Sequence, residues 1–141
     1  MDKRGRDQYR HWLTQPTRWA DNDIYGHVNN AAYYGFFDTV VNCFLIEQAG
    51  LDIHSGSVIG LVVETGCNYF APLAYPQAIE SGLRVARIGS SSVQYELGLF
   101  AEGHSEPAAQ GRFVHVYVDR DSRRPVQLPD KMRAALETIH A

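Results

Sequence analysis

The sequence predicts an α+β domain in which a curved antiparallel sheet encloses one long buried helix. Residues 30–49 carry apolar side chains around almost the whole helical cylinder, and only Asp38 and Asn42 form a narrow polar stripe. Four later stretches have the alternation or the short apolar runs that are typical of β-strands. A helix that is apolar on nearly all sides must be buried on nearly all sides, so we expect the strands to wrap around it.

Each expected element has a local signal at its ends. A first strand is expected at about 12–20, edged by Pro16, which cannot donate to a strand ladder. The long helix follows, with Asn29 or Asn30 as its N-cap and Gly50 just past its end. Further strands are expected at 58–69, 78–88, 92–101 and 113–119, and a short last helix is expected at 131–139.

The length of the chain predicts one domain. With 141 residues it lies near the most common domain size and can bury a core without disulfides or structural metals. Residues 1–9 are polar and are expected to form a disordered tail. The domain is therefore expected to cover 10–141.

The composition argues against several classes of protein. A net charge of −3 disfavours a nucleic-acid partner, because such proteins usually carry a basic excess. The chain has no apolar run of the length that a membrane span needs, and its polar start lacks the core of a signal peptide. The 2 cysteines form no C-x-x-C pair and the 6 histidines lack metal-ligand spacing. We therefore expect a cytoplasmic protein with no metal site.

The polar chemistry of the chain is concentrated directly before the long helix. Two carboxylates, a glycine, a histidine and three amides fall within positions 21–30. The start of a helix offers free N–H groups and a partial positive charge, and a nearby carboxylate can act as a base or nucleophile. Asp21 is expected to pair with Arg18 or to cap a turn, so Asp23 is the candidate catalytic residue. Its structural alternative is a carboxylate that only complements the helix dipole.

Four stretches resemble the 4-hydroxybenzoyl-CoA thioesterase-like family of the hot-dog fold. The most specific is RWADNDIYGHVNN at 18–30, which is similar to the family signature R-[WY]-x-D-x-D-x-x-G-H-V-N-N. The other three are individually weaker: NYFAP at 68–72, RIGSSS at 87–92 and VYVDRDSRRPVQLP at 116–129. The resemblance implies a hot-dog fold, in which an antiparallel sheet wraps around a central helix.

The resemblance also implies a mechanism without metal or cofactor. Asp23, the second carboxylate of the D-x-D signature, is implied to attack the thioester or to activate water. Gly26 is implied to let the backbone turn tightly into the helix, and His27 and Asn30 to shape the site. The backbone amides around Val28 and Asn29 are implied to polarise the thioester carbonyl. Active sites of this fold lie between subunits, which implies a homodimer or homotetramer.

Several further residues are candidates for substrate binding. Tyr25 and Tyr33 are candidates for narrowing the acyl pocket, and Glu64 is a candidate polar group facing the site from the second strand, expected at 58–69. The turn that contains Arg87, Ser91 and Ser92 is either a solvated turn or a contact for a CoA or phosphopantetheine arm.

The expected function is hydrolysis of an acyl-CoA or aroyl-CoA to free acid and CoA. Three alternatives remain: a thioesterase acting on acyl-carrier protein, an acyl-thioester hydratase or dehydratase, and a non-catalytic module that binds acyl thioesters. The hydratases of this fold show an H-x-P-x-x-P-G-type loop, whereas Val28 and Asn29 follow His27 here. This difference disfavours the second alternative.

Overall fold

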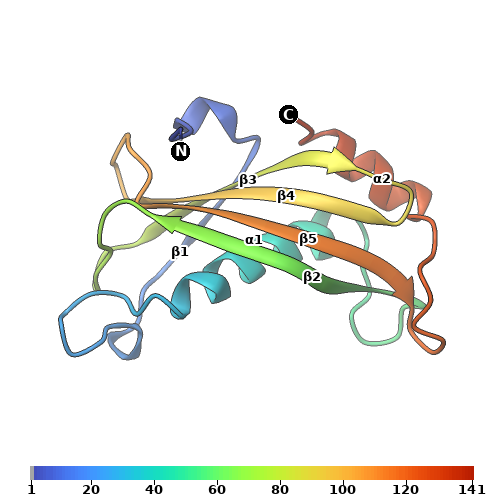
Figure 1. Ribbon diagram of the computed structural model, residues 1–141, viewed down its shortest axis with the longest axis horizontal. Coiled ribbons are helices and arrows are strands. Elements are labelled where there is room, and N and C mark those ends of the chain that lie inside the picture. Colours follow the sequence, from blue (N-terminus) through green and yellow to red (C-terminus); the bar gives the residue numbers. More distant parts are fainter. Residues whose placement is uncertain (1) are drawn as a thin grey trace.

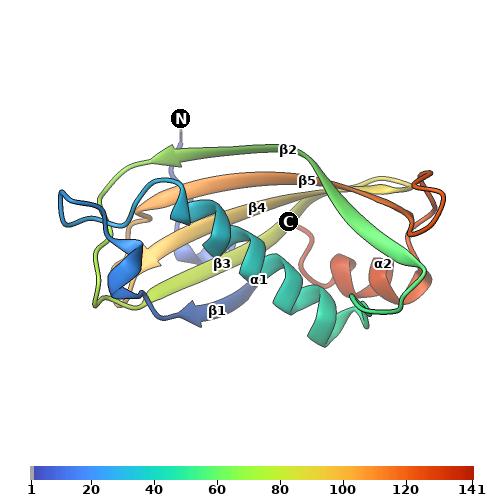
Figure 2. The same cartoon turned by 90° about the horizontal axis from the view of Figure 1, so that it is seen from below.

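The computed structural model describes residues 2–141, which form a five-stranded antiparallel sheet with one long helix across its inner face (Figures 1 and 2). The sheet order is β1-β3-β4-β5-β2, so β1 and β2 are its edges. The predicted α+β class is confirmed. The elements are η1 (Arg6–Gln8), β1 (His11–Gln15), η2 (Trp19–Asp21), α1 (Ala32–Gln48), β2 (Val58–Tyr69), β3 (Ile79–Ile88), β4 (Ser92–Ala101), β5 (Ala109–Asp119) and α2 (Asp130–Glu137).

Several element ends differ from the expected ones, and three of the differences have a clear physical reason. The first strand stops at Gln15, because Pro16 has no N–H for the ladder, and the 3-10 turn η2 replaces the rest of it. The helix α1 begins at Ala32 rather than about 30, and it ends before Gly50, whose φ is 69° as expected after a helix. The last strand starts at Ala109, because its first residues pair with β2 and β4 although they lack apolar alternation.

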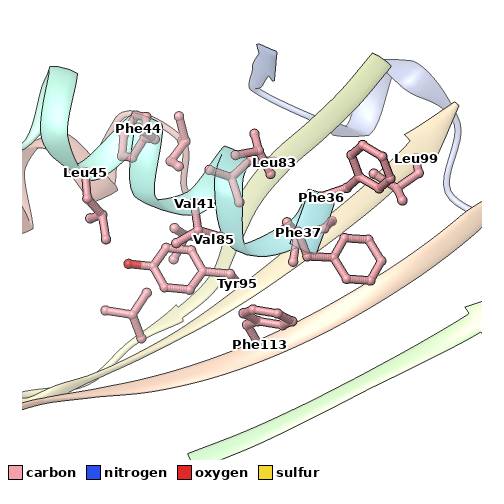
Figure 3. Packing of buried hydrophobic residues seen from close by; sticks show 14 of the residues in the cluster. Phe36, Phe37, Val41, Phe44, Leu45, Leu83, Val85, Tyr95, Leu99 and Phe113 are labelled. Atoms are coloured by element: carbon pink, nitrogen blue, oxygen red, sulfur yellow. The ribbon is translucent and has the colours of Figure 1, made fainter. Parts of the chain in front are cut away.

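The core lies between α1 and the inner face of the sheet (Figure 3). Phe37 packs on Gly111 of β5, where a side-chain Cβ would lie 2.4 Å from the ring, and its ring contacts Phe113 edge to face at 5.9 Å. The predicted fold, an antiparallel sheet wrapped around a long helix, is confirmed: the sheet packs on the buried face of α1, and the opposite face of α1 is exposed in one chain. The buried residues of α1 are Tyr33, Phe36, Phe37, Val40, Val41, Phe44 and Leu45, and the exposed ones include Gly35, Asp38, Thr39 and Ile46.

The N-terminal segment packs on the outer face of the sheet instead of forming the expected disordered tail. The Tyr9 side chain is 5% exposed and lies flat over Gly82 and Gly98, which pair with each other in β3 and β4. Arg4 donates to the Tyr9 hydroxyl at 3.1 Å, and its backbone N–H donates to Gln110. Gly82 and Gly98 thus leave room for the Tyr9 ring, and this ring anchors the segment to the sheet. Met1 lies outside the described residues.

We expect Gly98→Ala to release this anchor and to cost about 1–3 kcal/mol of stability, as overpacking usually does. The added Cβ would lie 2.6 Å from the Tyr9 ring, so Tyr9 would have to leave its place. Urea unfolding of the variant measures the loss. Gly66→Ala is the matched control, because no atom lies within 4 Å of its added Cβ. Equal stability of Gly98→Ala and the wild type would contradict the anchoring role of Tyr9.

Within residues 2–141, no helix is both long and apolar enough to cross a membrane. Cys43 and Cys67 are both free thiols.

Candidate active site

The loop between β1 and α1 is tied to the segment that enters β3. Thr17 Oγ1 donates to the Gln77 carbonyl at 2.6 Å, and the Tyr75 N–H donates to Asn22 Oδ1 at 3.0 Å. Val28 N–H donates to the Leu73 carbonyl at 2.7 Å. These three hydrogen bonds hold residues 17–28 at one end of the sheet, beside the start of α1 (Figure 2).

Asp21 is held in a structural pair with Arg18. One carboxylate oxygen accepts the Arg18 N–H at 2.7 Å, and the other accepts the guanidinium at 2.8 Å. Burial alone would raise the pKa of Asp21, but the hydrogen bonds from Arg18 outweigh it and lower that pKa. Both oxygens are occupied, which leaves the carboxylate no free position for chemistry.

Asp23 sits in a tight turn and keeps one oxygen free. Its Oδ1 accepts the Tyr25 N–H at 2.8 Å and, more weakly, the His27 N–H at 3.5 Å. Its own N–H donates to the His27 carbonyl at 2.8 Å, and Gly26 closes the turn with a φ of 82° that favours glycine. In the described chain no protein group donates to Oδ2. The turn therefore fixes the carboxylate through one oxygen and presents the other.

The amides expected to polarise a carbonyl are not available. Val28 N–H is bonded to Leu73, and Asn29 N–H donates to the Asp21 carbonyl at 2.8 Å. These two N–H groups are occupied because α1 starts later than expected. Residues 28 and 29 therefore lie in an extended segment before the helix, where Val28 forms a β-bridge with Asn22. Across residues 2–141, the N–H of Asn30 has no acceptor. Asn30 is therefore the candidate donor, and the Asn29 side chain instead accepts the Ala31 N–H at 2.9 Å.

Asp23 and Asn30 border the same hollow, which we call the Asp23–Tyr69 hollow. Its volume is about 520 Å³. Tyr33 and Tyr69 form one wall with ring centroids 4.9 Å apart, and the Tyr69 hydroxyl donates to the Asn30 carbonyl at 3.1 Å. Burial raises the pKa of both tyrosines, so both are neutral near pH 7. The lining residues are Asp23, His27, Val28, Asn30, Tyr33, Tyr69, Phe70, Ala71 and Pro72.

This arrangement has the parts that acyl transfer requires. Asp23, whose Oδ2 accepts no hydrogen bond within residues 2–141, and Asn30, whose N–H has no acceptor there, both line one hollow with an aromatic wall. The model of the thioesterase-like superfamily matches residues 17–136, which include the loop, α1 and the whole β2–β5 sheet. The chain belongs to this thioesterase-like superfamily. Thioester hydrolysis is its reaction class.

Solved structures agree with this assignment of the thioesterase. The PA5185 protein from Pseudomonas aeruginosa strain PAO1 is 61% identical, with a TM-score of 0.97 over 99% of this chain and 98% of that one. The PA2801 protein from Pseudomonas aeruginosa is 28% identical, with a TM-score of 0.85 over 91% and 98%. Slr0204, a 1,4-dihydroxy-2-naphthoyl-CoA thioesterase from Synechocystis, shares the fold at 16% identity, with a TM-score of 0.80 over 89% and 93%. No curated protein matches the chain.

Two predicted substrate-binding residues of the thioesterase do not face the hollow within one chain. Tyr25 lies at the tip of the turn, is 79% exposed and lines no part of the hollow. Glu64 lies on the outer face of the sheet, where it forms an ion pair with Arg112. A β-bulge between Val62 and Glu64 shifts the register by one residue, and such a shift moves a side chain to the other face.

Arg87, Ser91 and Ser92 also lie far from Asp23 in the same chain. The loop of Asp23 contacts the chain just before the start of β3, whereas Arg87 lies at the end of β3 and Ser91 and Ser92 follow it. The ten residues of β3 separate the two ends by about 30 Å. Within one chain these residues therefore cannot contact a group that is bound at the Asp23 carboxylate.

Tyr69, Phe70 and Pro72 line the hollow but were not predicted as site residues. Their stretch, NYFAP at 68–72, is one of the weaker parts of the family resemblance, from which no site role was expected for these residues. Knowledge of the strand order would have identified these three residues. β2 pairs antiparallel with β5, and Tyr69, its last residue, lies at the end of the sheet where α1 begins. Sequence patterns do not give strand order.

Proposed function

We propose that this thioesterase hydrolyses an acyl-CoA or aroyl-CoA to the free acid and CoA, with Asp23 as its catalytic residue. The observation that carries the proposal is that Asp23 and Asn30 line one hollow, while Asp23 Oδ2 and the Asn30 N–H each have no protein partner in the described chain. CoA as the thiol is supported by Slr0204, a relative of the same fold that is named as a CoA thioesterase.

In the general-base route, Asp23 takes a proton from a water molecule whose oxygen attacks the thioester carbonyl carbon. The carbonyl oxygen becomes an oxyanion that accepts a hydrogen bond from the Asn30 N–H. The carbon–sulfur bond then breaks, and the leaving thiolate takes the proton back from Asp23. In the nucleophilic route, Asp23 Oδ2 attacks the same carbon, the thiolate leaves, and water hydrolyses the resulting anhydride. Both routes need the same free oxygen.

The acyl group has an aromatic surface to lie against. Tyr33 is buried in the wall and Tyr69 is 45% exposed, so the edge of the hollow presents the Tyr69 ring to a ligand. His27, whose backbone is fixed by the turn, lines the same hollow. We assign these three side chains to positioning the acyl arm.

A second copy of the chain is proposed to cover the free edge of β2. This strand has twelve residues and pairs on one side only, with β5. Leu61, Val62 and Val63 on it are 37%, 48% and 60% exposed, and a long apolar edge of this kind is prone to pair with another strand. The edge ends at Tyr69, which lines the hollow, so the partner would lie beside the hollow. Light scattering tests this proposal: a dimer has twice the mass of one chain, which is 15.8 kDa.

The test of the activity is thiol release from a panel of acyl-CoAs that differ in chain length and aromaticity. We expect turnover of at least one member, with no added metal or cofactor. If only acyl-carrier-protein thioesters are hydrolysed, the substrate carries its acyl group on acyl-carrier protein and not on CoA. Binding of the whole panel without thiol release would support the non-catalytic alternative and contradict the proposal.

A further inference from the structure

A second hollow also borders Asp23, and we call it the Trp19–Ile24 hollow. Its volume is about 450 Å³, and it is lined by Trp19, Asn22, Asp23, Ile24 and Gly26. The Trp19 and Ile24 side chains are 76% and 92% exposed. Large apolar side chains that gather at a surface hollow usually contact a ligand or partner.

The walls of this hollow are held in place by the protein itself. The Trp19 ring packs edge to face on Tyr75, with centroids 5.9 Å apart. Tyr75 is in turn tied to the loop, because its N–H donates to Asn22 Oδ1 at 3.0 Å. This bond uses the carbonyl oxygen of the Asn22 side chain and leaves its NH₂ group as a donor. Gly26 also lines the hollow, and no atom beyond its two chain neighbours lies within 4 Å of a Cβ added there.

Asp23 is the residue that the two hollows share. A thioester carries two arms on its carbonyl carbon, one ending in the acyl group and one in the thiol. When the carbonyl is at Asp23 and Asn30, the two arms must leave in different directions. The acyl arm lies in the Asp23–Tyr69 hollow in the proposed function. The second hollow then remains for the other arm.

We propose that the Trp19–Ile24 hollow binds the pantetheine arm of the thioester and that Trp19 and Ile24 recognise it. Pantetheine carries a gem-dimethyl group and two amides. The dimethyl group fits the exposed indole face and the Ile24 side chain, and an amide carbonyl can accept from the Asn22 NH₂ group. This inference rests on the proposed function, because it takes the thioester carbonyl to lie at Asp23.

The experiment compares Trp19→Ala and Ile24→Ala with Ile53→Ala, the matched control. Ile53 is also half-exposed, at 50%, but lies outside both hollows. One acyl group is placed on two thiols, pantetheine and N-acetylcysteamine, which ends after the first amide. We expect the two hollow variants to raise KM about tenfold for the pantetheine thioester and less than about twofold for the short one, with kcat retained. Ile53→Ala should change neither.

Binding of free pantetheine, followed by calorimetry, separates this inference from the activity. If the wild type binds pantetheine and Trp19→Ala weakens that binding about tenfold, the inference holds even where no thioester is turned over. Equal losses on both thiols, or unchanged KM and binding in both hollow variants, would overturn it while the thioesterase activity stands. A fall in the mass of Trp19→Ala by light scattering would also overturn it, because the surface would then belong to a contact between two copies.

Discussion

Asp23→Asn is expected to lower turnover at least about 100-fold while the fold is retained. The reason lies in the unequal use of the two carboxylate oxygens. Oδ1 accepts the Tyr25 N–H at 2.8 Å, and an asparagine oxygen can accept the same bond. The free Oδ2 becomes an NH₂ group, which can neither take a proton from water nor attack a carbonyl carbon. The substitution therefore removes the chemistry and leaves the turn.

The measurement is thiol release from the best acyl-CoA of the panel, with circular dichroism as the check on folding. Asp21→Asn is the matched control, because Asp21 is paired with Arg18 at 2.8 Å and has no free oxygen. It should lower stability more than it lowers turnover. Near wild-type turnover of Asp23→Asn would refute the assignment, and a folded but inactive Asp21→Asn would show that the other carboxylate performs the reaction.

The position of Asp23 could be predicted because the signals for it are local. A D-x-D pattern, a glycine and an apolar helix follow one another within one stretch of chain. The turn at Gly26, with its φ of 82°, and the glycine after α1 depend on backbone conformations that few other residues adopt. Local chemistry of this kind is readable from a single sequence.

The backbone N–H that serves as donor and the face on which Glu64 lies could not be predicted from local sequence patterns. The helix begins only two residues later than expected. Because of this delay the Val28 and Asn29 N–H groups donate to other carbonyls, and within residues 2–141 the Asn30 N–H is left without an acceptor. One bulge in β2 turns Glu64 to the outer face. Both outcomes are set by long-range pairing, with Leu73 and β5 respectively, so no pattern within the loop or the strand predicts them.

His115 is a buried histidine of β5 that no prediction from sequence singled out. Its side chain is 3% exposed, and its Nδ1 lies 3.3 Å from the Tyr117 hydroxyl, which is bonded to the Tyr95 hydroxyl at 2.7 Å. In the described chain its Nε2 has no hydrogen-bond partner. Burial lowers the pKa of His115 from 6.5 to about 4, because the charged ring would lose its hydration.

Stability is therefore expected to fall as the pH drops from 6.5 towards 4. In this range the unfolded chain binds a proton at His115 and the folded chain does not, so acid favours the unfolded state by up to about 3 kcal/mol. Below pH 4 both states are protonated and the difference stops growing. His115→Phe removes this titration and leaves the Tyr95–Tyr117 bond in place.

Urea unfolding at a series of pH values tests the expectation. The free energy of unfolding of His115→Phe should fall less steeply between pH 6.5 and 4.5 than that of the wild type. His104→Gln removes an exposed histidine and should leave the wild-type slope unchanged. Parallel slopes for the wild type and His115→Phe would mean that His115 titrates normally in the folded protein. Because this pH dependence comes from a side chain in the core, it should appear equally in the inactive Asp23→Asn variant, which separates acid unfolding from any pH dependence of catalysis.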